Sequence, residues 1–533
     1  METQNESLWI LAMASKCTTL SPQIILLLFL LFSFSWIVLV LLYWAQPGGP
    51  AWGKYRHKIS PRTARLPHGP KGYPLIGSMK LILGLAHHKL TSMADLLKAR
   101  RLMAFSLGDT RVVITCNPDV AKEILCNSVF ADRPIKESAY SLMFNRAMGF
   151  APYGVYWRTL RRIAANHMFS PKQINFSEKQ RKNIAFQIKK IIDSKINEKF
   201  CVREMLKLAS LINIMESVFG KRYELDVAAA SLDSEAAELS QLVQEGYDLL
   251  GKLNWSDHLP WLGLFDVQRI RERCSGLVPR VNRFVTRIIS EHRTKDHVQE
   301  IGQDFVDVLL SLNGPDKLSN ADMVAVLWEM IFRGTDTVAV LIEWILARMV
   351  LHPEVQSKVQ DELDKVVGKS RPLMESDIPS LNYLQSVIKE VLRLHPPGPL
   401  LSWARLSITD TTLDGYHIPA GTTAMVNMWA ITRDPQIWVD PLRFYPERFD
   451  IDTDHFSVLG SDLRLAPFGS GRRSCPGKVL GLTTVSYWVG TLLHEFVWAQ
   501  SDQNPVSLAE IMKLSCEMAN PLTVVVNPRR NRA

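Results

Sequence analysis

The stretch of sequence that decides the fold is residues 468–477, which read Phe468-Gly469-Ser470-Gly471-Arg472-Arg473-Ser474-Cys475-Pro476-Gly477. It surrounds one cysteine with glycines and arginines. A thiolate needs an electropositive environment rich in main-chain groups, and glycines let N–H groups approach its sulfur. An arginine beside such a sulfur can also hold the acidic edge of a large anionic cofactor. Two interpretations follow: a cysteine bound axially to haem iron, or an ordinary surface turn with an idle thiol.

Length and composition place the chain among large globular proteins. It has 533 residues, 47% of them hydrophobic, and a formal net charge of +9. The basic excess is spread along the chain, which suits a protein beside anionic lipid or an acidic partner better than a nucleic-acid-binding protein. The seven cysteines form no Cys-x-x-Cys pair and no zinc spacing, so they indicate a reducing compartment.

Residues 24–45 predict a membrane-spanning helix. The segment reads IILLLFLLFSFSWIVLVLLYWA without a charge, and about 20 such residues span the core of a bilayer. A cluster of basic residues over 54–71 follows it, whereas Lys16 alone precedes it, so the bulk of the chain is expected to be cytosolic. We therefore expect a short lumenal tail at 1–23 and an uncleaved single-pass anchor at 24–45.

A hinge rich in proline and glycine, residues 46–77, follows the anchor. It contains Pro47-Gly48-Gly49-Pro50 and, further on, Leu66-Pro67-His68-Gly69-Pro70-Lys71-Gly72-Tyr73-Pro74. Such residues do not continue a helix and favour an extended, stiff spacer. The spacer is expected to hold one globular domain, residues 78–533, at a fixed tilt to the membrane.

The globular domain is predicted to be mainly α-helical with small β-sheets. Apolar residues recur with a helical period over 155–168, 178–197, 232–250, 280–292, 321–351, 353–367, 379–394 and 477–497. Short β-rich segments lie at 102–115 and 411–426, where Asp414-Gly415 indicates a hairpin turn. The domain is larger than most, which indicates that a large cofactor fills part of its core.

One predicted helix carries polar residues in its apolar middle. Within 325–351, Gly334, Asp336 and Thr337 interrupt a hydrophobic run. Burying an acid and an alcohol is costly without partners, so a helix widened there could hold a small ligand and route protons through the acid. The alternative is a threonine bonded to the preceding turn and an aspartate at a solvated edge.

Two weaker patterns place charged or aromatic residues on one helix face. Glu390 and Arg393 stand at i, i+3, and Arg448 downstream could share Glu390 to close a three-member network. Trp157 and Arg161 stand at i, i+4, where an indole N–H and a guanidinium could grip a carboxylate. Each pattern alone is more often an ordinary surface pair, or a core tryptophan beside a solvated arginine.

The order of these motifs carries a resemblance. The chain shows, in succession, WRTLR, GTDT, Glu-x-x-Arg, PERF and FGSGRRSCPG. From anchor to C-terminus it resembles a microsomal, class II cytochrome P-450, a haem-thiolate monooxygenase. The segments APYGVYWRTLRRI, FRGTDTVA and LLSWARL more particularly resemble the plant A-type KLUH/PLASTOCHRON branch. The resemblance implies a cytochrome P-450 fold, with haem between a long distal helix and a proximal cysteine loop.

The resemblance assigns the haem-binding residues, the cofactor being haem b (iron protoporphyrin IX). Cys475 would be the metal ligand, the thiolate bound to iron. Phe468 would shield the sulfur, and Gly471 and Gly477 would permit close main-chain approach. The haem propionates would be bound by Trp157, Arg161, Arg405 and Arg473.

It also assigns a structural triad and a catalytic pair. Glu390, Arg393 and Arg448 would form the triad that fixes the proximal core, which is a folding role. Asp336 and Thr337 would be catalytic and deliver protons to dioxygen, because productive O–O cleavage needs two protons.

One position departs from the family's pattern. Arg333 stands where the family usually has glycine or alanine, and Val338 replaces a usual serine or threonine. Arg333 shares a helix face with Thr337, so one hypothesis pairs it with an acidic substrate group such as a fatty-acid carboxylate. The alternative is an internal pair with Asp336 or Glu329, the arginine stem lining the pocket wall.

Further substrate contacts are expected from two apolar segments. Residues 134–150 are rich in methionine and phenylalanine and supply Met143, Phe144 and Phe150. The segment after the Glu-x-x-Arg helix supplies Leu401. Both are expected to contact substrate by analogy to the family, although an apolar loop is more often plain core.

The expected activity is insertion of one oxygen atom from O2 into a small lipophilic substrate, a fatty acid or related lipid-derived signal acting in plant organ growth. No Gly-x-Gly-x-x-Gly dinucleotide motif is present, so electrons are expected from NADPH through a separate NADPH–cytochrome P-450 reductase at the endoplasmic reticulum membrane. Two alternatives remain open: a haem-thiolate isomerase or dehydratase that does not use O2, and a membrane-anchored haem-binding sensor.

Overall fold

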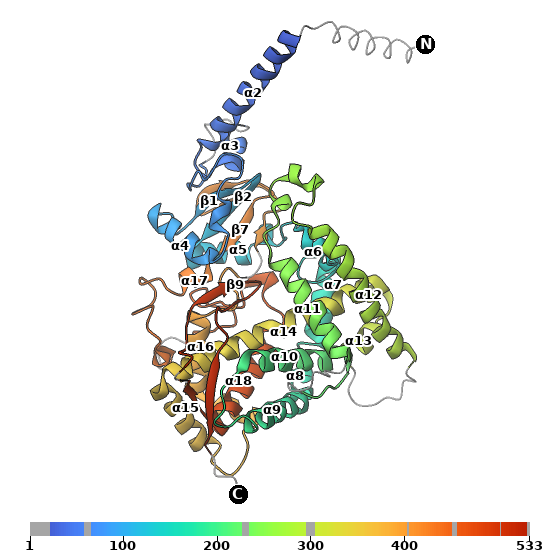
Figure 1. Ribbon diagram of the computed structural model, residues 1–533, viewed down its shortest axis with the longest axis vertical. Helices are drawn as coiled ribbons and strands as arrows, with labels where there is room; N and C mark the ends of the chain where they lie inside the picture. The colour runs from blue at the N-terminus through green and yellow to red at the C-terminus, as the bar shows by residue number, and fades with distance from the viewer. Residues whose placement is uncertain are drawn as a thin grey trace.

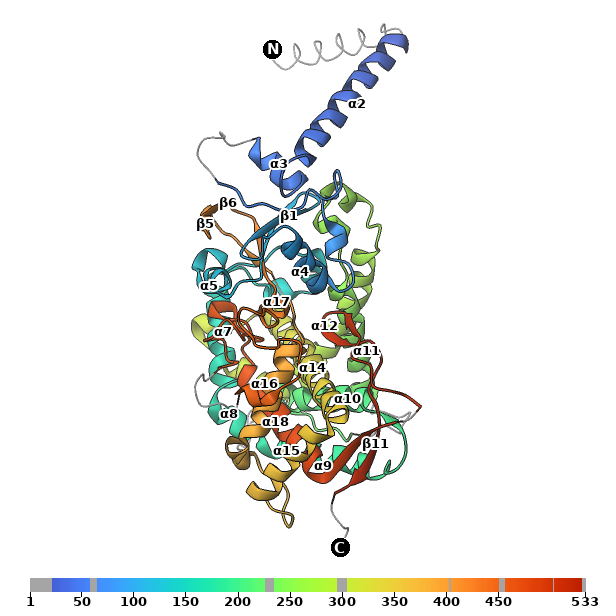
Figure 2. The same cartoon turned by 90° about the vertical axis from the view of Figure 1, so that its left-hand side faces the viewer.

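The computed structural model of the protein describes residues 22–57, 65–225, 234–294, 304–401, 404–449, 456–501 and 503–529. Helix α2 (Pro22–Trp44) projects from one end of the body in both views (Figures 1 and 2). The most apolar 18-residue window of this helix has a mean hydropathy of 3.0 and is not buried, so its length and composition fit a membrane anchor. Most of the predicted lumenal tail, residues 1–21, lies outside the described residues.

The hinge predicted at 46–77 differs from an extended spacer because it contains a short helix, α3 (Pro50–Arg56). Trp52 in this helix is fully buried. Its indole N–H donates to the carbonyls of Phe105 at 3.1 Å and Val112 at 3.3 Å. The prolines and glycines do end α2, but this buried indole then fastens the segment to the first β-sheet.

Helices form most of the body and confirm the predicted mainly α-helical class. They are α4 (Ala86–Leu96), α5 (Pro118–Cys126), α6 (Glu137–Ser141), α7 (Val155–His167), α8 (Pro171–Phe176), α9 (Glu178–Asp193), α10 (Val202–Phe219), α11 (Ser234–Gly251), α12 (Ile270–Thr294), α13 (Phe305–Ser311), α14 (Asn320–Leu351), α15 (Pro353–Val366), α16 (Asn382–Leu394), α17 (Met428–Ile431) and α18 (Lys478–Glu495). Helix α12 begins well before the predicted 280–292. The prediction began too late because a proline is common in the first turn of a helix, whereas Pro279 lies inside this one.

The strands form small sheets around the helices. The largest has the order β1 (Met103–Leu107), β2 (Thr110–Thr115), β7 (Thr423–Val426) and β4 (Arg405–Leu406), with only β2 and β7 parallel. A second sheet has the order β3 (Phe200–Cys201), β11 (Thr523–Pro528) and β8 (Phe496–Gln500). A third is the hairpin of β9 (Glu510–Met512) and β10 (Cys516–Met518).

The predicted hairpin at Asp414-Gly415 is confirmed. Strands β5 (Thr411–Leu413) and β6 (Tyr416–Ile418) pair in antiparallel register across it. The φ angles of Asp414 and Gly415 are 50° and 75°. Two positive φ angles in a two-residue loop are typical of the type I′ turn that Asp-Gly favours.

Helix α14 is the central element of the body (Figure 1). It begins after Ser319, whose Oγ accepts the N–H of Asp322 at 3.1 Å. It packs along α10 and against α12, α16 and α18. Gly334 permits the close approach of α10, because a Cβ there would lie 2.6 Å from Cγ1 of Ile214.

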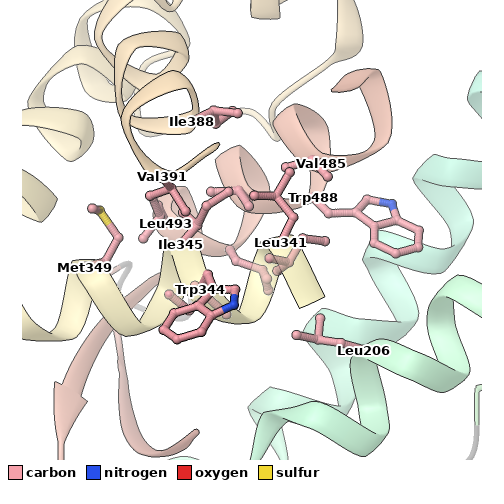
Figure 3. Close-up of a cluster of buried hydrophobic side chains, with 14 of the residues drawn as sticks. Leu206, Leu341, Trp344, Ile345, Met349, Ile388, Val391, Val485, Trp488 and Leu493 are labelled. Atoms are coloured by element: carbon pink, nitrogen blue, oxygen red, sulfur yellow. The ribbon is translucent and has the colours of Figure 1, made fainter. Parts of the chain in front are cut away.

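The core on one side of α14 joins it to α16, α18 and α10. Figure 3 shows large apolar side chains from these four helices meeting in one cluster. Those labelled are Leu206, Leu341, Trp344, Ile345, Met349, Ile388, Val391, Val485, Trp488 and Leu493. Because this packing holds α14 against the C-terminal helices, it sets the distance between α14 and the loop of Cys475.

Replacing Trp52 with alanine tests the attachment of α3. The change removes a buried indole and two hydrogen bonds, a loss of about 3–5 kcal/mol in a core. We expect trypsin to cut after Lys54 or Arg56 roughly tenfold faster or more, because local opening becomes cheaper. The control is Trp255→Ala, since Trp255 is 47% exposed. Equal cleavage rates in the two variants would contradict a fastened hinge.

Candidate active site

A cavity of about 310 Å³ lies between α14 and the loop of Cys475. Its wall combines apolar side chains with five arginines. The predicted site residues in this wall are Trp157, Arg161, Arg333, Thr337, Leu401, Arg405, Phe468, Arg473, Cys475 and Gly477. Segments far apart in sequence therefore meet at one space, with a sulfur on one side and a helix hydroxyl on the other.

Cys475 presents its sulfur to the cavity from a tightly folded loop. Its main-chain N–H donates to the carbonyl of Phe468 at 2.9 Å. Removal from bulk water raises the pKa of the thiol, while the N–H of Gly477 and the charges of Arg333 and Arg161 act against that rise. Such a thiol gives up its proton when a metal ion binds it. The donor set therefore fits a single metal–sulfur bond.

Gly471 supports the loop from outside the cavity wall. It has a φ of 66°, and a Cβ there would lie 2.1 Å from the carbonyl oxygen of Leu125. Only glycine combines this φ with so close an approach. The glycine holds the loop against the end of α5 and makes no contact with the cavity.

Trp157 and the predicted propionate-binding arginines donate to main-chain carbonyls. Arg473 donates to Ala131 at 2.8 Å and Ala151 at 2.7 Å, and its guanidinium lies 4.4 Å from the ring centre of Trp157. The other bonds to carbonyls are Trp157 to Met148 at 3.0 Å, Arg161 to Ser474 at 3.0 Å and Arg405 to Ser470 at 3.3 Å.

The pKa values show that this cationic cluster is costly. Burial, together with the neighbouring arginines, lowers the pKa of Arg405 to about 9. Burial lowers the pKa of Arg473 to about 10, although Asp132 acts against the shift. Cations held at such cost favour an anionic ligand. The cluster therefore fits the two carboxylates of a haem.

Arg133 belongs to the same cluster and was not predicted. It lines the cavity and is buried, and it donates to the carbonyls of Gly149 at 3.2 Å and Ala404 at 3.0 Å. Burial, then the charges of Arg405 and Arg473, hold its pKa well below the usual value. An arginine before a proline is an ordinary pattern, and Ile135 close by is 70% exposed, so the sequence carried no signal for this role.

The two predicted proton-delivery residues face different ways. Thr337 lines the cavity. Asp336 does not, and its carboxylate lies 3.5 Å from Nζ of Lys207 on α10. Consecutive residues of an α-helix point about 100° apart, so the two side chains reach different surroundings. Lys207, which also lies 3.3 Å from Glu517, is partly exposed and connects Asp336 to the protein surface.

Arg333 takes the internal partner that was the alternative hypothesis. Its Nε donates to Oε1 of Glu329 at 2.8 Å, one turn earlier on α14. Glu329 is fully buried and also accepts the N–H of Gly149. The partner is therefore Glu329, not Asp336, and the arginine also forms part of the cavity wall.

Three predicted substrate contacts lie elsewhere among the described residues. Met143, Phe144 and Phe150 pack in a hydrophobic core cluster and are absent from the cavity wall. Phe144 lies against Phe332 of α14, with ring centres 5.1 Å apart. These side chains fix the segment onto α14, and it is residues 148–149 that reach the cavity. Leu401 does line it, with a φ of 55°.

The three residues predicted as a structural triad, Glu390, Arg393 and Arg448, lie together. Glu390 is fully buried and lies 2.7 Å from Nε of Arg393 and 3.1 Å from Nε of Arg448. Arg393 also donates to the carbonyls of Thr432 and Pro441, both at 2.7 Å. The network joins α16 to the segment that precedes the cysteine loop.

A buried cluster that the sequence did not indicate anchors the β9–β10 hairpin, whose tip residues Leu514 and Ser515 line the cavity. At its base, the carboxylate of Glu510 lies 3.1 Å from Nε2 of His87 and 3.4 Å from Nδ1 of His395. His88 makes a similar contact at 3.1 Å.

His395 should make stability depend on pH. Burial, with the charge of Arg348, lowers its pKa from 6.5 to about 4. The unfolded chain therefore takes up this proton near pH 6.5, and the folded protein only near pH 4. The contribution of His395 to the free energy of unfolding is therefore complete above pH 6.5. It is lost as the pH falls toward 4, and the loss is about 3 kcal/mol for such a shift in pKa.

Thermal unfolding between pH 7 and 5 measures the first part of this loss, about 2 kcal/mol. We expect His395→Gln to be less stable at pH 7 but to have a flatter pH profile, because the titrating group is gone. His352→Gln is the control, because the His352 side chain is partly exposed, and it should follow the wild-type profile. Parallel profiles for His395→Gln and wild type would contradict the assignment.

Comparison with known proteins agrees with this geometry. A family model described as cytochrome P450 matches residues 67–520. "Cytochrome P450 78A3" of Glycine max is 62% identical over 528 residues, covering 99% of each chain. "Cytochrome P450 78A9" of Arabidopsis thaliana is 63% identical over 528 residues, covering 98% of each chain.

A solved structure shares the fold. "Zebra fish cytochrome P450 another structure with Progesterone" superposes with a TM-score of 0.72 at 24% identity, covering 83% of this chain and 99% of that one. The fold predicted from the resemblance is confirmed.

Proposed function

Because the chain belongs to the cytochrome P450 family, we propose that it inserts one oxygen atom from O2 into a fatty acid or related lipid. Monooxygenase chemistry with haem b is the property of the family, and the near relatives are plant proteins. The observation that carries the proposal is the single cavity that joins the sulfur of Cys475, a cluster of buried arginines and the hydroxyl of Thr337.

The residues of the cavity divide the work of holding the cofactor. Cys475 would bind the iron, and Phe468 would shield the sulfur from water. Arg161, Arg405 and Arg473 would bind the propionates, with Arg133 beside them. Trp157, whose one N–H donates to the Met148 carbonyl, would support Arg473 through the contact with its ring. When bound, the haem supplies the oxidising chemistry, and its thiolate ligand favours O–O cleavage.

Helix α14 would supply the groups that deliver protons to the cavity. Thr337 lines the cavity, where its hydroxyl would donate a hydrogen bond and hold a water molecule in place. Asp336 would take up protons from solvent through the partly exposed Lys207, 3.5 Å away. A general acid held at such a site typically contributes a factor of about 10²–10⁴ in rate.

The cavity wall supports a lipophilic substrate. The distal part is built mainly of apolar side chains, including Ile214, Met330, Phe332 and Leu341. Arg333 adds one polar group to this wall. Because Glu329 already pairs with Arg333, the support for a fatty acid is the apolar wall together with the family resemblance, and a fatty acid is the first substrate to test.

The proposed setting is the endoplasmic reticulum membrane, with NADPH–cytochrome P-450 reductase as electron donor. The apolar helix α2 supports membrane attachment. The exposed Arg472 next to the cysteine loop supports docking of an acidic partner. By its resemblance to the KLUH/PLASTOCHRON branch, the product would be a lipid-derived signal in plant organ growth.

Reconstitution with the reductase tests the function. We expect a hydroxylated fatty acid whose formation requires both NADPH and O2, and its loss in Cys475→Ala. Product formed without NADPH would favour an isomerase or dehydratase. Haem binding without turnover of any lipid tested would favour a sensor. Either result would overturn the proposal.

Thr337→Ala tests proton delivery. We expect product per NADPH to fall by about tenfold or more, with the missing electrons recovered as hydrogen peroxide, because proton transfer by such a group is worth at least that factor. Thr335→Ala is the matched control, since the Thr335 hydroxyl bonds to the Ile331 carbonyl at 2.8 Å and does not line the cavity. Unchanged coupling in Thr337→Ala would exclude this role.

A further inference from the structure

Glu329 is a buried charge that none of the proposed roles uses. It lies on α14 and is fully buried. Its Oε1 accepts from Nε of Arg333 at 2.8 Å. Its two oxygens accept the N–H of Gly149 at 2.7 and 3.0 Å. Burying a carboxylate costs several kcal/mol unless it is well paired. The contacts with Arg333 and Gly149 therefore indicate what Glu329 does.

The close contact between Gly149 and the Glu329–Arg333 ion pair requires a glycine at position 149. A Cβ on Gly149 would lie 2.1 Å from Oε1 of Glu329 and 2.1 Å from Nη2 of Arg333. No other residue lets the main chain come so close to the ion pair. The loop that contains Gly149 is therefore built to meet α14 at this point.

The same peptide group faces the cofactor side. The N–H of Gly149 and the carbonyl of Met148 belong to one peptide unit, and in a trans peptide they point in opposite directions. The N–H donates to Glu329. The carbonyl accepts from Nε1 of Trp157 at 3.0 Å and from Nη1 of Arg473 at 3.2 Å. A carboxylate on the N–H strengthens the acceptor at the other end.

The carbonyls of the next residues along the chain accept hydrogen bonds from two arginines of the cavity wall. Gly149 accepts from Nε of Arg133 at 3.2 Å. Ala151 accepts from Nη2 of Arg473 at 2.7 Å. Both arginines line the cavity, as does Trp157. Residues 148–151 thus carry, through main-chain atoms, the bonds that orient three of the cavity's polar side chains.

We propose that Glu329 is a positioning residue for the haem. It fixes the peptide between Met148 and Gly149, and that peptide sets Trp157 and Arg473 against the acidic edge of the cofactor. Glu329 also lines the cavity, but its carboxylate oxygens accept from Gly149 and Arg333, and the proposed role acts through that peptide. The inference rests on the proposed function only in taking haem as the ligand of this cavity.

The second buried glutamate of α14 provides a matched control. Glu343 is also buried and accepts from Nε of Arg203 at 2.9 Å. It also accepts a main-chain N–H, that of Leu522, at 2.9 Å. Like Glu329, it pairs with an arginine and accepts a main-chain N–H, but neither Glu343 nor Leu522 is part of the cavity wall. Glu343→Gln therefore reproduces the cost of neutralising a buried carboxylate without disturbing residues 148–151.

The experiment measures haem loss from the purified full-length holoprotein to excess apomyoglobin, with no substrate present. We expect Glu329→Gln to release haem about 10-fold faster, the low end of the effect of removing an outer-shell partner. Gly149→Ala should do the same although Glu329 is intact, because the added Cβ pushes the peptide away. The thiolate-type spectrum of the reduced carbonyl complex should persist in both.

Glu343→Gln should lower the thermal unfolding temperature as much as Glu329→Gln does, yet keep haem loss within about twofold of wild type, the margin for uncoupled sites. Equal haem loss from the two glutamine variants would overturn the inference and leave the proposed function intact. A wild-type protein that binds no haem would overturn the proposed function itself.

Discussion

The burial of guanidinium groups around one cavity is the constraint on which the rest of the structure depends. Burial lowers the pKa of Arg133, Arg405 and Arg473. Such cations are tolerated only where hydrogen bonds and an opposite charge compensate them. The carbonyls of separate loops accept their bonds, so those loops must converge on the cavity. The remaining positive charge then selects an anionic ligand.

Helix α14 meets this constraint from the opposite side. Its middle is apolar enough to be buried, yet it carries several polar side chains, each with its own surroundings. Glu329 meets the main chain of Gly149, Thr337 faces the cavity, and Asp336 meets Lys207 of α10. The helix runs unbroken from Asn320 to Leu351, without the widening that one of the two interpretations of its sequence allowed.

Features that depend on residues close together in the sequence could be predicted. The Asp414-Gly415 turn is one, because two positive φ angles suit few residues. The loop of Cys475 is another, because glycine and arginine around a sulfur have few other uses. The segment 134–150 was predicted less well. Its phenylalanines and methionines indicated a cavity wall, whereas Phe144 packs in the core.

The cluster of Glu510 with His87 and His395 could not be predicted, since its members come from three distant segments and each alone is an ordinary residue. Arg133 was missed for the same reason.

The sequence by itself determined the elements and their chemistry: the apolar anchor, the helical periods, the cysteine loop and the ordered motifs. These depend on residue types within a few positions of one another. The tertiary structure alone decided which atom each buried charge meets. It turned Arg333 toward Glu329, and it set the peptide of Gly149 between α14 and Arg473. The partners of Glu329 and Arg473 in this peptide are main-chain atoms. Every residue has such atoms, so no pattern of side chains in the sequence predicts these contacts.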